Sequence, residues 1–151
     1  MTFRIAQEEA SARLYEAMSL WLNDKGYTGA AKAWAKDAEG EWEHAQWAKD
    51  FLLDMGVNPK LSAIPEPQQE FAGLPDIIRK SYEHEIVVTQ QCNELANYAY
   101  VNGNHLLYQL AMKYMTEQQE ELGKVQTYLD KLTAFGESEI AMKLFDTELG
   151  A

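Results

Sequence analysis

Apolar residues recur at intervals of three and four along nearly the whole chain, which is the spacing of amphipathic α-helices. No stretch alternates convincingly with the period of two that a half-buried β-strand would show, so we expect an all-α protein. Glycines and short polar turns mark the expected helix ends. The predicted helices cover residues 2–23, 28–55, 75–100, 104–135 and 138–149, with Thr28 and Asn104 as N-caps of the second and fourth.

The segment between the second and third helices, VNPKLSAIPEPQQEFAGL, is the longest expected loop, and its prolines exclude a regular helix. A helix of about 28 residues is roughly 42 Å long, whereas about 18 extended residues reach roughly 60 Å. The segment can therefore run the length of a bundle and start the third helix parallel to the second. The other turns are short, so the pattern predicts a four-helix bundle with one long crossover and a short fifth helix.

A glutamate interrupts the apolar stripe of each long helix once. A single glutamate on such a stripe would most simply mean that the buried face of the helix is misplaced by a residue, or that the glutamate side chain extends to solvent. Four carboxylates that converge in one core would instead repel one another, and each bare charge is costly to desolvate. The stripes as drawn contain no lysine or arginine, so metal ions are the positive charge that this arrangement predicts. The four residues are Glu8, Glu41, Glu85 and Glu121.

A histidine adds to this pattern, because His44 follows Glu41 by three residues. That spacing places the two side chains about 60° apart around a helix and roughly 4.5 Å apart along it, so both can reach one ion. Glu-x-x-His pointing into a four-helix core is typical of di-iron carboxylate proteins. Carboxylate oxygens with one imidazole suit Fe(II), and Mn or Zn could also bind.

The 151 residues are 46% hydrophobic and 25% charged, which fits one domain over residues 1–151, with the bundle in 1–135 and a short helix and tail in 136–151. The single cysteine, Cys92, excludes an internal disulfide and a cysteine-rich zinc site. No apolar run suits a signal peptide or a membrane span, so we expect a cytoplasmic protein with no membrane partner. The net charge of −11 argues against nucleic acid as a partner.

Longer motifs resemble those of bacterial non-haem ferritins, and the similarity covers nearly the whole chain. They are YEAMSLW in the first helix, GAAKAWAKDAEGEWEHA in the second, YEHEIVVTQQCNEL in the third, EQQEE in the fourth and FDTEL near the end. The resemblance implies a ferritin-like fold and a hollow homo-oligomeric cage of twenty-four subunits that stores ferric mineral. It also implies an intrasubunit di-iron ferroxidase centre with the ligands Glu8, Glu41, His44, Glu85, Gln118 and Glu121.

The resemblance also assigns catalytic roles. Glu41 matches the carboxylate that bridges the two irons, and Tyr15 matches the tyrosine beside the centre. Glu8 and His44 would complete the ligands of one Fe(II), and the remaining carboxylates those of the other. Dioxygen or hydrogen peroxide would accept one electron from each iron.

Some positions depart from the family pattern. Gly40 stands where many bacterial ferritins have an additional glutamate of a third iron site. The first helix begins roughly two turns later than in typical members, which places Glu8 near a helix end. Trp42 stands where the haem-binding bacterioferritins have a methionine, and Lys124 where they have a second histidine, so no haem is expected.

Two other functions fit the same residues. A shell or scaffold subunit with impaired ferroxidase activity would result if the shortened first helix displaced Glu8. A small di-iron oxidase acting on an organic substrate would use the same ligands with an added substrate pocket. Native mass distinguishes a cage from a small enzyme, and the rate of Fe(II) oxidation distinguishes an active subunit from an inactive one.

Overall fold

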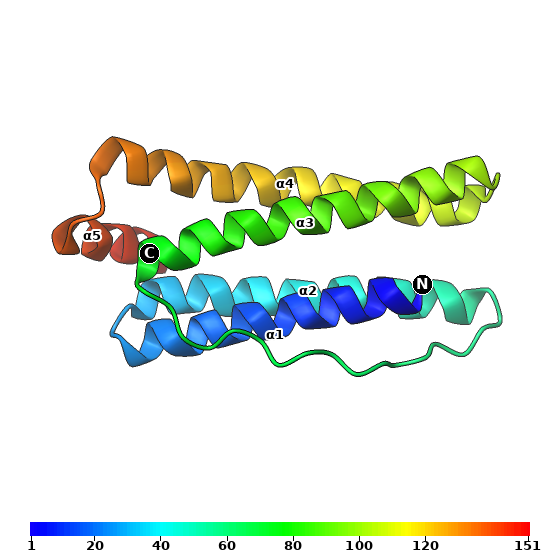
Figure 1. The fold of residues 1–151 in the computed structure, drawn as a ribbon, viewed down its shortest axis with the longest axis horizontal. Helices are drawn as coiled ribbons and strands as arrows, with labels where there is room; N and C mark the ends of the chain where they lie inside the picture. The colour runs from blue at the N-terminus through cyan, green and yellow to red at the C-terminus, as the bar shows by residue number, and fades with distance from the viewer. The chain divides into compact units, whose positions relative to one another are not determined.

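The computed structural model describes residues 1–151 and contains five α-helices and no strand (Figure 1). The all-α prediction is confirmed, and each observed helix end lies within one residue of the predicted one. None of the helices combines the length and the apolar character that crossing a membrane requires. The helices are α1 (Thr2–Asp24), α2 (Thr28–Asp54), α3 (Leu74–Val101), α4 (His105–Phe135) and α5 (Glu139–Gly150).

The helix ends follow local sequence signals, with one exception. The Asn104 side chain accepts a hydrogen bond from the Leu107 amide at 3.1 Å, as an N-cap does. The prediction that Thr28 caps α2 is wrong, since Thr28 is already helical and Tyr27 is the N-cap, with no side-chain bond. The reason is the tight turn before α2, in which the Tyr27 carbonyl accepts the first helical bond, from the Ala31 amide at 2.9 Å.

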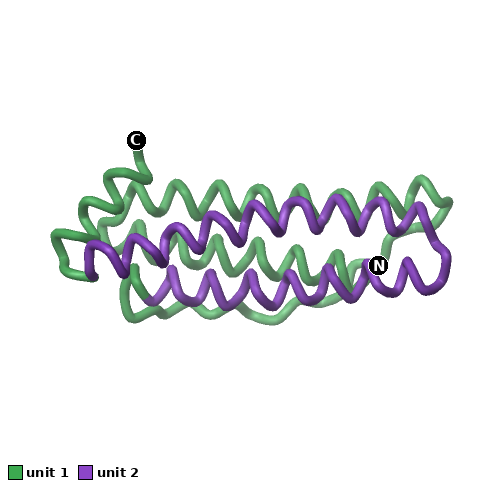
Figure 2. Tube along the Cα trace, turned by 90° about the horizontal axis from the view of Figure 1, so that it is seen from above, with its two compact units in different colours: residues 1–75, 137–151 green, residues 76–136 purple.

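Two compact units make up the chain: residues 1–75 with 137–151, and residues 76–136 (Figure 2). In the first unit α1 and α2 lie side by side and antiparallel, and the segment after α2 runs back along them (Figure 1). Near its end, Phe71 packs edge-to-face against Trp21 of α1, with the ring centroids 6.1 Å apart. The predicted long crossover therefore returns the chain to the end of the pair where α1 finishes.

Helix α5 belongs to the first unit and packs on the start of α2. Its Asp146 carboxylate accepts a hydrogen bond of 2.7 Å from the Ala30 amide, and so supplies the cap that Thr28 does not. Gly29 and Gly150 let the two helices approach closely: a Cβ on Gly150 would lie 2.9 Å from the Gly29 Cα. The contact between α2 and α5 therefore depends on the absence of side chains.

The second unit is the antiparallel pair of α3 and α4, joined by a turn at residues 102–104. Ile78, Val88 and Cys92 of α3 and Tyr114 of α4 are almost completely buried. Gln118 Nε2 donates a hydrogen bond of 3.0 Å to Thr89 Oγ1 and so connects the two helices. Each helix of the pair buries one stripe, as the apolar periodicity predicts.

Candidate metal centre

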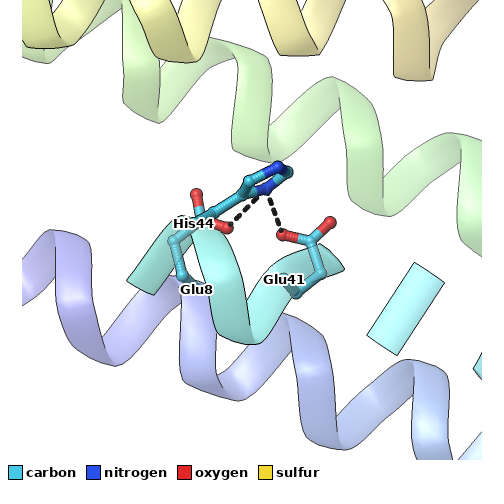
Figure 3. A group of neighbouring side chains, drawn as sticks. All are labelled: Glu8, Glu41 and His44. Carbon is cyan, nitrogen blue, oxygen red and sulfur yellow. Dashed lines mark hydrogen bonds and ion pairs between the residues drawn. The ribbon is translucent and has the colours of Figure 1, made fainter. Parts of the chain in front are cut away.

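Three metal-ligand side chains gather in the first unit: Glu8 from α1 and Glu41 and His44 from α2 (Figure 3). All three are buried. His44 Nδ1 lies 3.2 Å from Glu41 Oε2 and 3.6 Å from Glu8 Oε2. One ligand atom from each residue lies within 4.8 Å of the others. The structure thus brings together three of the six ligands that the sequence predicts.

Packing around these residues fixes their directions. Small residues lie along the buried faces of both helices, among them Ala12 of α1 and Ala45 and Ala48 of α2, so the two backbones approach closely. The imidazole of His44 packs against the ring of Trp47 on the next turn, with the ring centroids 4.6 Å apart. The Glu-x-x-His spacing therefore directs both α2 ligands toward α1.

The trio strongly perturbs the protonation of its members. Burial alone would lower the pKa of His44, but hydrogen bonds to Glu41 and Glu8 and the negative charges of both raise it from 6.5 to about 10. Burial would raise the pKa of Glu8, yet hydrogen bonds with Glu41 and His44 and the nearby positive charges of Arg4 and His44 lower it below its usual value. A metal ion bound to His44 must therefore displace a firmly held proton.

A buried arginine, which the apolar periodicity of α1 does not predict, lies next to this group. Arg4 is 3% exposed, and its Nη2 lies 2.5 Å from Glu8 Oε1. The apolar stripe of the first helix begins at Ile5 and therefore excludes Arg4. Its spacing of four residues from Glu8 was the available signal, because residues at i and i+4 are neighbours on a helix.

The other predicted ligands lie in the second unit. Glu85 is fully buried, and its Oε2 accepts a hydrogen bond of 2.9 Å from Gln118 Nε2. Glu121 is less buried, with 19% of its side chain exposed, and pairs with Lys124 Nζ at 3.0 Å. The structure thus joins Glu85 to Gln118, whereas Glu121 pairs with a lysine on its own helix. Tyr15 is buried on α1, two turns after Glu8.

The chemistry of the trio fits a divalent transition metal. Two carboxylates and one imidazole are the ligand set that Fe(II), Mn(II) and Zn(II) accept. Donor atoms about 2.1 Å from a common ion lie at most about 4.2 Å apart. The ligand atoms of the trio lie within 4.8 Å of one another, so small side-chain movements would bring all three to one ion. Without an ion, His44 and Arg4 are the positively charged neighbours of the two carboxylates.

Comparison with known proteins identifies relatives of this chain. The profile of the ferritin-like domain matches residues 4–135. The bacterial non-heme ferritin of Escherichia coli O6:H1 is 32% identical over 139 residues, which are 92% of this chain and 84% of that protein. The one from Campylobacter jejuni is 28% identical over 143 residues, 95% of this chain and 86% of that protein.

A solved structure extends the similarity to three dimensions. The open pore ferritin from the hyperthermophilic archaeon Archaeoglobus fulgidus superposes with a TM-score of 0.95 at 30% identity, over 99% of this chain and 91% of that chain. The predicted fold class, a ferritin-like four-helix bundle with a short fifth helix, is thereby confirmed. The chain belongs to the ferritin family.

Proposed function

We propose that this protein oxidises Fe(II) to Fe(III) and stores the ferric product. The observation that carries the proposal is the buried trio of Glu8, Glu41 and His44 in a chain of the ferritin family. Two buried carboxylates that share a histidine provide a strong site for a divalent cation. Relatives named bacterial non-heme ferritins support iron as that cation.

The oxidation site is proposed to hold two ferrous ions as substrates. Glu8, Glu41 and His44 bind one, and Glu41 bridges to the second, which Glu85 and Glu121 complete. The hydrogen bond from Gln118 to Glu85 supports this assignment, because it fixes the direction of a carboxylate that would otherwise rotate.

The residues of the site favour electron loss from iron. Anionic carboxylates stabilise Fe(III) more than Fe(II), since the ion with more charge gains more from them. Two ferrous ions give one electron each to dioxygen, which takes up two protons and leaves as hydrogen peroxide, or to hydrogen peroxide, which takes up two protons and leaves as water. Tyr15, buried two turns from Glu8, is assigned to hydrogen-bond a ligand or to donate an electron.

The proposed assembly is a single-domain subunit in a cage of twenty-four copies without haem, located in the cytoplasm. Helix α5 supports assembly, because Ile140 is 74% and Leu144 65% exposed in the single chain although both are apolar. Native mass spectrometry tests the assembly. A mass of one or a few subunits would contradict the cage and favour a small enzyme.

The activity is tested by mixing the metal-free protein with Fe(II) in air and following ferric absorbance. Replacing Glu41 by alanine removes the bridging ligand, so the initial rate is expected to fall at least about tenfold. Glu43→Ala is the matched control, because Glu43 is an exposed glutamate on the same helix and its loss leaves the trio intact. Equal, slow rates for all three proteins would contradict the ferroxidase and leave an iron-storing shell.

A further inference from the structure

The two oxygens of the Glu8 carboxylate face different positive groups. Oε1 lies 2.5 Å from the guanidinium of Arg4, one turn earlier on α1. Oε2 lies 3.6 Å from Nδ1 of His44 on α2 (Figure 3). Oε1 therefore faces Arg4 on the same helix, and Oε2 faces the ligand His44 on α2. Glu8 is therefore positioned to offer the metal a single oxygen while Arg4 holds the other.

The two positive groups differ in how they respond to an arriving cation. His44 can lose its proton and become a neutral ligand. The guanidinium of Arg4 is buried, so water screens its positive charge weakly. A cation bound at Glu8 Oε2 must therefore share the carboxylate with a permanent positive charge.

A guanidinium in this position has two opposing effects on binding. It orients the carboxylate, which favours metal binding, and it repels the metal, which opposes it. Two positive charges on the metal and one on Arg4 interact through a buried carboxylate at short range, where Coulomb terms are large. Repulsion is expected to exceed the gain from orientation.

We infer that Arg4 is a fixed counter-charge that lowers the affinity of the Glu8, Glu41 and His44 site for divalent cations, so that iron passes through the site rather than remaining in it. The inference rests on the proposed function, in which iron is a substrate. Arg4 therefore changes the affinity for metal through its contact with Glu8 and does not itself bind the metal.

The test is a titration of the full-length metal-free protein with Co(II), which air does not oxidise under these conditions, at one fixed pH. Calorimetry gives the dissociation constant, and visible absorption reports coordination. Arg4→Gln is expected to tighten binding about tenfold or more. Arg13→Gln is the matched control: it removes the same charge from an exposed position on the same helix, and is expected to leave the dissociation constant unchanged.

Arg4→Lys separates the effect of the positive charge at this position from the effect of orienting the Glu8 carboxylate. It also replaces Arg4→Gln in the test if that variant does not fold. It keeps the charge but loses the planar fork, so its affinity is expected to stay near that of the parent protein. Unchanged or weaker binding in Arg4→Gln, or a tenfold loss in Arg4→Lys, would overturn the inference. A different result would contradict the proposed metal site itself: Co(II) would then bind the parent protein and Glu41→Ala with equal affinity.

Discussion

Replacing Gly29 by alanine is expected to destabilise the protein by about 1–3 kcal/mol and to detach α5 from α2, because overpacking a tight contact forces backbone shifts. The added Cβ would overlap the backbone carbonyl oxygen of Asp146 and lie 3.0 Å from the Gly150 amide nitrogen. Backbone atoms cannot rotate away as side-chain atoms do, so α5 as a whole must move. That movement also removes the Asp146 carboxylate from the Ala30 amide.

Thermal unfolding measures the loss of stability, and limited proteolysis near residues 136–138 measures the detachment. Gly40→Ala is the matched control, since it makes the same change in the same helix where no neighbouring atom lies within 4 Å of the new methyl group. That control is expected to stabilise the helix by roughly 0.5–1 kcal/mol. Two variants of equal stability would contradict the tight contact between α2 and α5.

The metal-free protein is expected to become less stable as pH rises from 7 toward 9.5. His44 has a folded-state pKa of about 10 against 6.5 when unconstrained, so the folded state holds a proton that the unfolded state has lost. The stabilisation is complete below about pH 6.5 and disappears as pH rises through about 10. One such proton gives a slope of at most about 1.4 kcal/mol per pH unit.

Chemical denaturation across this pH range, at one protein concentration and with metal removed by chelation, measures the slope. His44→Gln is expected to remove it, because glutamine does not titrate. His105→Gln changes an exposed histidine and is expected to keep the slope of the parent protein. Parallel curves for His44→Gln and the parent protein would show that the imidazole carries no proton in the folded state at neutral pH.

Helix positions and the inward direction of Glu8, Glu41 and His44 were predictable from the sequence, because periodicity and the Glu-x-x-His spacing are local signals. The cap of α2 was not predictable from the sequence, because the hydrogen bond from the Ala30 amide is accepted by Asp146, 116 residues away. No local pattern distinguishes that aspartate from others on α5. Long-range contacts of this kind require the fold itself.

The charge balance of the site was predicted only in part. Repulsion among the four carboxylates predicts metal ions as the only charges that neutralise them. Arg4 beside Glu8 and Lys124 beside Glu121 show that part of the compensation comes from the chain. Both bases were identifiable by their spacing of four and three residues, but a stripe defined by apolar residues excludes them.

The pairing of charges within single helices has a consequence for folding. Arg4 and Glu8 are separated by four residues, and Glu41 and His44 by three, so both pairs can form as soon as their helices do. Contacts this close in sequence require almost no loop closure and form early, whereas the approach of Glu8 to His44 must wait for α1 to meet α2. Glu8 therefore enters the core already paired with Arg4, so collapse of the helix pair need not bury that carboxylate as a bare charge.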